Sequence, residues 1–455
     1  MIAKLAQRLP FYYGWVIIGA AFALMALAVN ARTAFSLFLP PILAEFAWDR
    51  GVTAGAFSFG FLISAFLSPV LGQLMDRKGP QLVAQLGVAA AIAGLLLAAY
   101  GQVPWHLYLT LGVLVGVGSV CLGYSGQALY LPNWFVQRRG LAMGIAYSGV
   151  GVGSIILLPW LQRLIDQQGW RHATWTLGLV ILVLGVPLTF LLRHRPQDLA
   201  LLPDGVLPAS ASASLARRSV TSTAATSTVA ASSTAAKPKT NVVDANWVAI
   251  DWTLARALRT SRFWWLASGY FGSMYAWYAV QVHQTKYLVD IGFTSTDAAW
   301  ALGAVSLAGI PGQIVLGHIS DRVGREIVFV LSNVGFVATY LLLLALGTSP
   351  AVGLLYLMIV MQGAIGYGLT SVFGAIPAEI FEGKHFGSIF GTLMLAAISG
   401  GAFGPWLTGF LFDRTGNYVL AFWLGVLASI YAAVAIVIAA PGKVRAVAGR
   451  MKTVA

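Results

Sequence analysis

The sequence has very little charge and a single cysteine. Only 9% of its 455 residues are charged, whereas soluble globular domains carry about a quarter. Cys121 alone cannot form an intramolecular disulfide or a cysteine-based zinc cluster, and its apolar surroundings predict a packed thiol. Because 58% of the residues are hydrophobic and the mean hydropathy is +0.79, the composition excludes a water-soluble domain and indicates a membrane protein.

The motifs of several protein classes are also absent from the sequence. No Gly-x-x-x-x-Gly-Lys-Ser/Thr motif occurs, so this chain alone does not drive transport with ATP. His-Glu-x-x-His, paired carboxylates within the apolar segments and a nucleophile with a nearby base are absent too. We therefore predict that the chain is not an enzyme and has no metal site or cofactor. The lack of a soluble signalling domain argues against a sensor.

The apolar residues gather into twelve windows long enough to cross a bilayer as helices. They cover 14–39, 54–75, 80–100, 106–131, 140–162, 174–192, 263–289, 298–317, 326–347, 351–375, 387–412 and 418–440. The first window has no small-residue cleavage site, so we interpret it as a retained span and not as a signal peptide. The predicted fold class is an all-α polytopic membrane protein with twelve transmembrane helices.

The net charge of +13 is distributed unevenly between the two sides of these windows. With the N-terminus inside, the cytoplasmic segments hold 22 of the 28 Lys and Arg residues. This asymmetry follows the positive-inside rule and predicts that both termini are cytoplasmic. The basic excess therefore reflects topology, and we do not expect nucleic acid as a partner.

A polar segment separates the first six windows from the last six. We predict four parts: a six-helix bundle over 1–192, a flexible cytoplasmic linker over 193–262, a second six-helix bundle over 263–440, and a basic cytoplasmic tail over 441–455. The stretch from Ala209 to Ala236 is almost entirely Ala, Ser, Thr and Val, which cannot form a core. A short amphipathic helix is expected near Trp252–Thr260.

The two bundles repeat each other at an offset of about 245 residues. Four pairs of motifs match: Gly72-x-x-x-Asp76-Arg77-x-Gly79 with Gly317-x-x-x-Asp321-Arg322-x-Gly324, Gly140-x-x-x-Gly144 with Gly387-x-x-x-Gly391, Pro159-Trp160 with Pro405-Trp406, and Pro132 with Pro377. Such matches indicate a duplicated six-helix unit in parallel orientation. The glycines permit close helix packing, which is either static or allows sliding during transport.

At the repeated Gly-x-x-x-Asp-Arg-x-Gly loops the chain resembles the major facilitator superfamily, over its whole length except the linker. The resemblance implies two pseudo-symmetric bundles. It also implies that the loops latch the cytoplasmic face in the outward-open state, with Asp76, Arg77, Asp321 and Arg322 as gate residues. An acid in such a loop can meet the N-terminal dipole of a neighbouring helix. The alternative is a membrane-interface anchor that only sets topology.

Ionisable residues inside apolar windows are costly, and two basic ones occur late in the first and seventh windows. Arg32 and His283 are at near-equivalent places in the two halves, and we expect them to face each other across the outer pathway. No Asp or Glu lies in the middle of a window, so a transported anion would complement Arg32. In the alternative, Arg32 extends to the lipid headgroups and His283 is a neutral hydrogen-bonded group.

Other polar side chains at membrane depth complete the predicted binding site. Asn30 lies in the first window, and Tyr124 and Gln127 lie in the fourth. In the seventh, a polar-aromatic stripe at helical spacing could line a wet cavity or form a helix contact; it consists of Trp277, Gln281 and Gln284. Lys286 and Asp290 are expected to form a local pair.

Further motifs resemble the group of oxalate/formate antiporters and monocarboxylate transporters. They are Tyr13-Gly14-Trp15, Asn133-Trp134-Phe135-x-x-Arg138-Arg139-Gly140 and the glycine-rich run that follows. Arg32 falls near the helix-one lysine of animal monocarboxylate carriers. That group also uses an arginine in helix eight, and its oxalate exchangers a lysine in helix eleven. Here 298–317 and 387–412 contain neither Lys nor Arg.

These observations predict a secondary transporter of a small organic anion, a mono- or dicarboxylate, that works by alternating access. Transport would be proton symport or anion exchange, with coupling through His283 or the substrate itself. The alternative is an efflux carrier for an amphipathic drug or metabolite. We expect a monomer in the cell membrane, of the bacterial inner-membrane type, surrounded by lipid.

Overall fold

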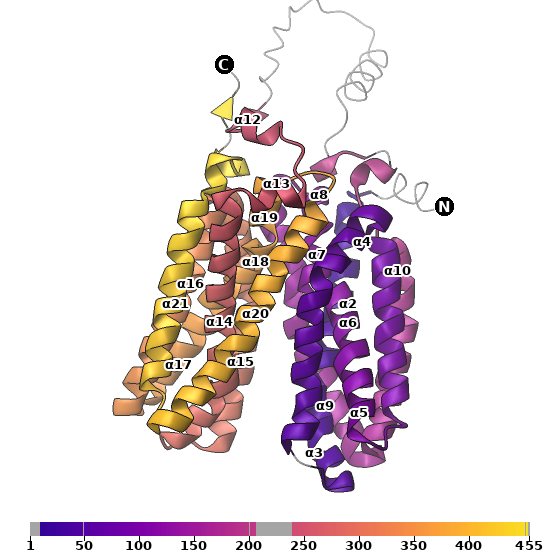
Figure 1. The fold of residues 1–455 in the computed structure, drawn as a ribbon, viewed down its shortest axis with the longest axis vertical. Coiled ribbons are helices and arrows are strands. Elements are labelled where there is room, and N and C mark those ends of the chain that lie inside the picture. The colour runs from indigo at the N-terminus through magenta and orange to yellow at the C-terminus, as the bar shows by residue number, and fades with distance from the viewer. Residues whose placement is uncertain (1–9, 49, 200, 206–238, 451, 454–455) are drawn as a thin grey trace, which may run out of the picture.

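Two helical bundles stand side by side in the computed structural model, which describes residues 10–48, 50–199, 201–205, 239–450 and 452–453. Figure 1 shows the N-terminal half in indigo to magenta and the C-terminal half in salmon to yellow. The chain enters the first helix and leaves the last one at the same end of the molecule, where the predicted linker also lies. We call this the linker end. The charge distribution predicts that it is cytoplasmic.

The N-terminal half is a series of long helices with local breaks. Its elements are α2 Gly14–Thr33, α3 Phe35–Phe46, α4 Arg50–Ala98, α5 Pro104–Leu107, η1 Tyr108–Leu114, α6 Val115–Leu122, α7 Tyr124–Ala128, α8 Leu131–Trp134, α9 Arg139–Val180, η2 Ile181–Gly185 and α10 Val186–Leu191. The window predicted over 14–39 is therefore two helices, and that over 106–131 is broken at Gly123, whose backbone is extended.

The C-terminal half follows the same plan. Its elements are α14 Ser261–Asp290, α15 Ser295–Val323, α16 Arg325–Thr348, α17 Val352–Val360, η5 Met361–Ile365, η6 Gly366–Gly368, α18 Leu369–Phe373, α19 Ala375–Ile380, α20 Phe386–Thr415 and α21 Val419–Ala439. The broken helix that runs from α17 to α19 corresponds to the broken fourth span of the first half. The duplication in the sequence is thus matched by repeated helix breaks.

Within the described residues, nine helical stretches are long and apolar enough to cross a membrane. Two of them, Phe59–Ala98 and Arg139–Leu191, contain 40 and 53 residues, and each turns sharply at a glycine with positive φ. Gly79 has φ 78° and Gly169 has φ 83°, a region that favours glycine because it has no Cβ. Each stretch therefore contains two spans. Together with the 30-residue helix α14, the described residues supply twelve membrane-length helices.

The described parts of the predicted linker and tail pack on the linker end. They contain η3 Pro196–Leu199, η4 Pro203–Gly205, β1 Lys239–Thr240, α12 Ala245–Val248, α13 Leu254–Leu258, η7 Pro441–Lys443, η8 Ala448–Arg450 and β2 Lys452–Thr453. β1 pairs antiparallel with β2, Lys239 opposite Thr453. Trp252 and Ala257 are buried, in the segment where the amphipathic helix was expected. The Ala/Ser/Thr-rich stretch lies outside the described residues.

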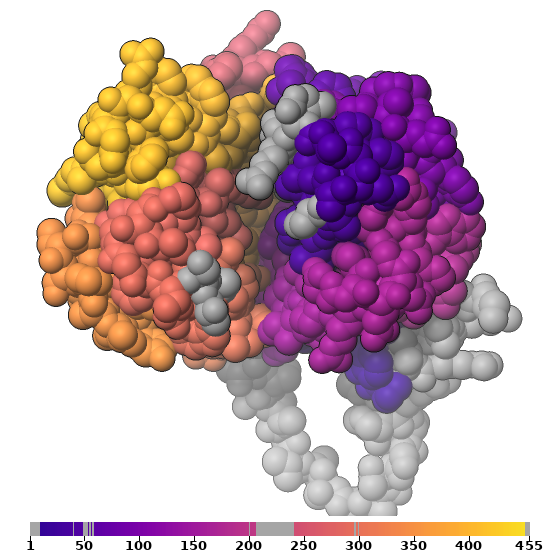
Figure 2. Space-filling view, turned by 90° about the horizontal axis from the view of Figure 1, so that it is seen from below, coloured from indigo at the N-terminus to yellow at the C-terminus, as the bar shows by residue number. Residues whose placement is uncertain are grey.

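The halves contact each other mainly through two helix pairs, α4 with α20 and α9 with α15. At the end opposite the linker, the space-filling view shows a furrow between the two halves (Figure 2). The molecule is therefore joined at the linker end and hollowed between the halves at the other. The residues beside this boundary are the candidates for a solute site.

Candidate functional site

Arg32 lies where the two halves meet. It is close to the end of α2, and its guanidinium carbon stands 3.6 Å from the centroid of the Phe61 ring in α4, a cation–π contact. Tyr278 of α14 is close enough to interact electrostatically with it. The Phe61 and Tyr278 rings meet edge to face, with their centroids 5.7 Å apart. The guanidinium therefore belongs to a cluster that contains residues of both halves.

Tyr124 brings a second hydroxyl group to this boundary from the N-terminal half. It begins α7, directly after the break at Gly123, and its ring meets that of Tyr147 at 5.0 Å. Tyr147 donates a hydrogen bond to the Tyr124 carbonyl over 3.3 Å. Tyr124 lies near Tyr278 and Tyr367 of the C-terminal half. The break in the fourth span thus places a phenol opposite the other half.

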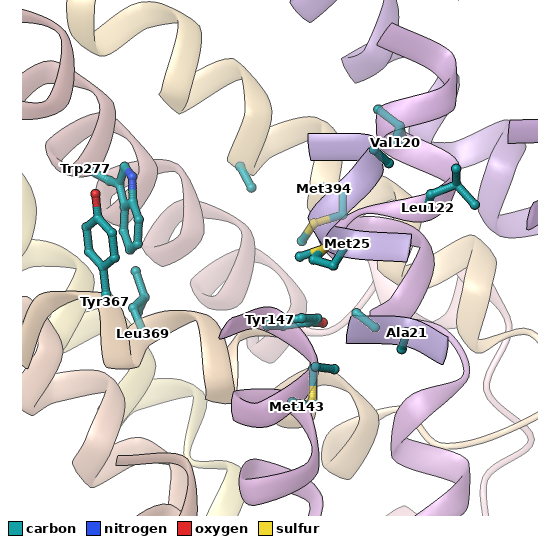
Figure 3. Close-up of a cluster of buried hydrophobic side chains, with 14 of the residues drawn as sticks. Ala21, Met25, Val120, Leu122, Met143, Tyr147, Trp277, Tyr367, Leu369 and Met394 are labelled. Atoms are coloured by element: carbon teal, nitrogen blue, oxygen red, sulfur yellow. The ribbon is translucent and has the colours of Figure 1, made fainter. Parts of the chain in front are cut away.

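In the C-terminal half, Trp277 and Tyr367 hold the amide of Gln281. The two rings stack with centroids 4.2 Å apart, and Figure 3 shows them face to face. The Gln281 carbonyl oxygen accepts from Trp277 Nε1 at 2.9 Å and from the Tyr367 hydroxyl at 3.0 Å. Two residues of the predicted stripe therefore act together, and Tyr367, which sequence reasoning missed, completes the group.

Asn30 and Gln127 connect helices. Asn30 is fully buried and donates to the carbonyls of Ala26 and Val150, while its oxygen accepts from Ser154 at 2.7 Å. Gln127 donates to Ala21 at 2.7 Å and to the Leu122 carbonyl at 2.9 Å. The Leu122 carbonyl lies at the end of α6, where the helix ladder stops. Both amides therefore satisfy backbone groups inside the N-terminal half.

His283 and Gln284 lie within the C-terminal half. The Nε2 atom of His283 is 2.9 Å from the carbonyl oxygen of Pro405, and Nδ1 is 3.4 Å from the Tyr418 hydroxyl. These contacts join α14 to α20 and to the start of α21, within the C-terminal half, and neither involves Arg32. Gln284 is fully buried, and its two amide atoms have no hydrogen-bond partner among the described residues.

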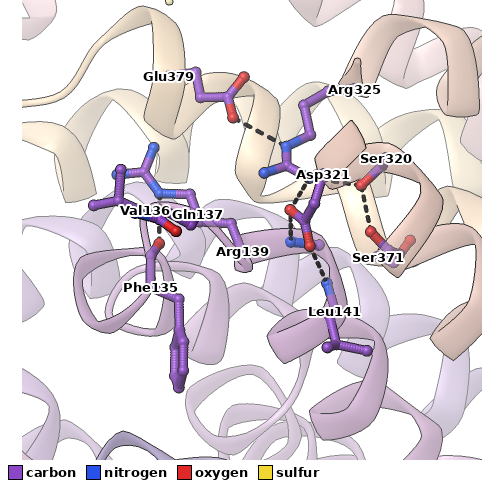
Figure 4. Close-up of polar contacts among 12 residues, drawn as sticks. Phe135, Val136, Gln137, Arg139, Leu141, Ser320, Asp321, Arg325, Ser371 and Glu379 are labelled. Carbon is purple, nitrogen blue, oxygen red and sulfur yellow. Dashed lines mark hydrogen bonds and ion pairs between the residues drawn. The ribbon is translucent and has the colours of Figure 1, made fainter. Parts of the chain in front are cut away.

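The repeated acids lie at matching places at the linker end. Asp76 accepts from the backbone N–H groups of Gly387 and Ser388 at 2.7 and 2.9 Å, at the start of α20. Asp321 accepts from Gly140 and Leu141 at 2.9 and 3.0 Å, at the start of α9 (Figure 4). A carboxylate on free N–H groups at a helix N-terminus is stabilised by the helix dipole. Each acid thus binds a helix of the opposite half, and we call these contacts the two latches.

The motif arginines Arg77 and Arg322 are exposed. The base that pairs with Asp321 is a different residue, Arg325. Arg325 is fully buried, forms an ion pair with Asp321, and binds Glu379 over 3.0 Å (Figure 4). Position 80, which corresponds to Arg325 in the repeat, is a proline. Comparison of the two motif copies could have revealed this asymmetry, because only the second copy continues with a base after its glycine.

Glycines cross at both latches. A Cβ on Gly72 would overlap the Gly387 carbonyl, and a Cβ on Gly140 would overlap that of Gly317. All four glycines belong to the repeated motifs. The backbones can approach this closely only because neither partner has a side chain. The repeated glycines therefore form two helix crossings, one at each latch, where the halves are in backbone contact.

Glu382 connects the N-terminal half with the tail at the linker end. Glu382 lies 3.9 Å from Nη2 of Arg139 in the N-terminal half and 3.1 Å from Nη2 of Arg445 in the tail. Arg139 is buried and also donates from Nε to the carbonyls of Pro132 and Phe135, both at 2.9 Å. The linker end is thus closed by ion pairs and hydrogen bonds between the halves.

Metal ligands do not cluster in the part of the chain that the structure describes: it contains no group of three or more His, Cys, Asp or Glu side chains that could hold an ion. The arrangement consists instead of a guanidinium, phenols and an amide between two bundles that are joined at one end. Such an arrangement can bind a small polar solute and change which end is open.

Comparisons with known proteins agree with this architecture. The family profile described as Major Facilitator Superfamily matches residues 17–294 and 266–452. The crystal structure of the transporter FucP in the outward conformation matches with a TM-score of 0.62 and 16% identity, over 93% of this chain and 98% of that one. The latter likeness concerns the fold.

Curated relatives include monocarboxylate transporters. Monocarboxylate transporter 13 of Rattus norvegicus is 26% identical over 90% of this chain and 85% of its own length. Monocarboxylate transporter 11 of Mus musculus is 29% identical over 90% of this chain and 83% of its own. The predictions of a twelve-helix transporter fold and of a non-enzymatic protein are thereby confirmed. This chain is a multi-pass membrane protein that belongs to the major facilitator superfamily of secondary transporters, which carry small molecules.

Proposed function

We propose that the protein transports a small organic anion, a mono- or dicarboxylate, by alternating access. The observation that supports this most is the position of Arg32, which stacks on Phe61 beside Tyr278 at the boundary between the halves. A guanidinium there offers paired N–H donors that match a carboxylate. The two relatives described above are named monocarboxylate transporters, which supports the same substrate class.

Alternating access would use the two latches. With the linker end cytoplasmic, closed latches and the furrow at the opposite end correspond to an outward-facing form. Opening at the linker end requires α20 to leave Asp76 and α9 to leave Asp321. A solute that contacts both halves can lower the free energy of the intermediate in which both ends are closed.

Transport could be coupled to protons or to a second anion. The proton would be carried by His283, which Pro405 and Tyr418 hold in place, or by the acid itself. We propose either symport of the acid with a proton or exchange of two anions. An imposed pH gradient that drives accumulation selects symport, and a rate that ignores the gradient selects exchange.

The test is counterflow in proteoliposomes with a panel of labelled organic acids. Replacing Arg32 with Gln removes the charge but keeps an amide, and we expect exchange of the preferred acid to fall by about tenfold or more, as the loss of a charged hydrogen bond implies. Arg414→Gln is the matched control, because Arg414 also lies over a phenylalanine ring, Phe410 at 5.0 Å, but is exposed near the far end of α20.

Unimpaired exchange by a folded Arg32→Gln variant would contradict the proposal. The second candidate function, efflux of an amphipathic drug or metabolite, is favoured by the aromatic rings at the boundary, Phe61, Tyr124 and Tyr278. It predicts transport of lipophilic cations that is unchanged or faster in Arg32→Gln. Screening both solute classes with both variants separates the two functions.

A further inference from the structure

Gln281 has an amide whose orientation is fixed by its neighbours. Trp277 Nε1 lies 2.9 Å from one atom of that amide, and the Tyr367 hydroxyl lies 3.0 Å from the same atom. An indole N–H can only donate a hydrogen bond, so the atom that it meets must be the carbonyl oxygen. The amide nitrogen consequently points away from both rings.

That nitrogen is available to a solute. The Gln281 side chain is partly exposed, and none of the residues that the structure describes accepts a hydrogen bond from its Nε2. Trp277 and Tyr367, by contrast, are buried. The two rings therefore position the amide, and Gln281 offers its two N–H donors beyond them.

Gln281 lies on the side of α14 that carries Tyr278, a residue at the boundary between the halves. Gln281 follows Tyr278 by three residues in α14, so the two share one side of the helix. Tyr278 lies near Arg32, and Tyr367 lies near both Tyr278 and Tyr124. The amide of one half and the guanidinium of the other thus flank the same group of hydroxyls.

The side chains between these two donors are aromatic. Phe61, Tyr124 and Tyr278 are all partly exposed, and the Phe61 and Tyr278 rings are inclined at 81° to each other. Offset or edge-to-face contact with such rings favours a flat unsaturated group over a short alkyl chain. Two donors beside such rings fit a carboxylate attached to a planar group.

We propose that Gln281 is a specificity-determining residue whose Nε2 donates to the solute, and that the substrates are carboxylates attached to a planar aromatic or unsaturated group. This inference rests on the proposed function and deepens it. Arg32 binds the carboxylate from the N-terminal half while Gln281 binds it from the C-terminal half. Trp277 and Tyr367 are positioning residues that keep the amide oxygen away from the anion.

The test compares labelled benzoate with labelled acetate in counterflow by the full-length protein. Gln281→Glu keeps an oxygen for Trp277 and Tyr367, removes the N–H donors and adds a negative charge. We expect the wild type to have a KM for benzoate about tenfold lower than for acetate, and Gln281→Glu to raise the benzoate KM by about tenfold or more. kcat should change less, because the donor acts in binding.

The double variant Trp277→Phe with Tyr367→Phe provides an independent measurement. It removes the N–H and O–H that hold the amide oxygen, so the amide can rotate and present that oxygen to the anion. We expect a rise in the benzoate KM that disappears when Gln281 is already Glu, a non-additivity that a purely structural role of the rings would not produce. If Gln281→Glu does not fold, this double variant still tests the role of the Gln281 amide.

The outcomes distinguish a failure of the proposed function from a failure of the role of Gln281. If the wild type exchanges neither acid, nor any other acid of the panel, the proposed function is wrong. If it exchanges benzoate and Gln281→Glu has an unchanged KM, or the effects of the variants simply add, the role of Gln281 is wrong while anion transport stands. Equal KM values for benzoate and acetate would overturn the planar substrate class.

Discussion

Amide side chains at membrane depth have two different uses in this protein. Asn30 and Gln127 donate to backbone carbonyls and join helices, whereas Gln281 is held by its oxygen and keeps its nitrogen available. The sequence identifies all three by their depth in an apolar window. It cannot tell them apart, because the direction of a side chain depends on which carbonyl or ring lies opposite on another helix.

Asn30 gives a test of this distinction. Replacing it with Leu removes its hydrogen bonds with the Val150 carbonyl and the Ser154 hydroxyl, which stay bonded to each other, and each lost bond costs about 0.5–1.5 kcal/mol. We expect a lower Tm in detergent and an unchanged KM for the transported acid. Ser154→Ala, which removes one of the three contacts, should produce a smaller drop. A raised KM at unchanged Tm would show that Asn30 binds solute.

The basic residues near the gate show the same limit of sequence reasoning. The motif identifies Arg77 and Arg322, which are exposed, while the buried partner of Asp321 is Arg325, one turn further along. The positions of the acids follow from the repeat. The choice among neighbouring arginines depends on where Glu379 lies, which only the packing of α19 against α16 decides.

At the scale of helices, hydropathy predicts the number of spans well and their shape poorly. The twelve windows correspond to membrane-length helices, but the first has a bend at Ala34 and the fourth has a break at Gly123. Both irregularities lie next to candidate residues, Arg32 and Tyr124. A window average cannot show a break, because the residues on either side are equally apolar.

The crossing of α4 and α20 at Gly72 and Gly387 can be tested by substitution. Gly72→Ala places a methyl group against the Gly387 carbonyl and forces α4 and α20 apart, at a cost on the order of 1–3 kcal/mol to the form closed at the linker end. Gly303→Ala in α15 is the matched control, since a Cβ there meets nothing within 4 Å.

The effect can be measured as the labelling rate of a cysteine placed at Met143, in a background where Cys121 is replaced by Ser. Met143 is fully buried beside Gly374 of the other half, so it becomes reachable when the linker end opens. We expect faster labelling in Gly72→Ala and the wild-type rate in Gly303→Ala. Equal rates in both variants would mean that the crossing does not hold the closed form.

For the whole molecule, the two latches are alike in geometry and unequal in charge. Asp76 binds a helix N-terminus, and Asp321 does so while paired with the buried Arg325 and, through it, Glu379. Asp321→Asn would lose the ion pair with Arg325, which would keep Glu379 as its partner. The two sides of the linker end should therefore differ in how firmly they hold.

Asp321→Asn is expected to open the linker end more than Asp76→Asn. Both variants weaken a contact of about 0.3–2 kcal/mol between a carboxylate and a helix end, and Asp321→Asn also loses the ion pair that orients residue 321. Labelling of the cysteine at position 143 should be fastest in Asp321→Asn and intermediate in Asp76→Asn. The reverse order would contradict the assignment of the stronger latch to α9 and α15.

The tail provides a second partner for one of the ion pairs that close the linker end. Glu382 is shared between Arg139, which belongs to the half that must move away, and Arg445, which stays with its own half. When the halves separate, the carboxylate keeps a positive neighbour and Arg139 keeps its two carbonyls. Neither ion is therefore left without a partner when this contact breaks, so its separation costs little free energy.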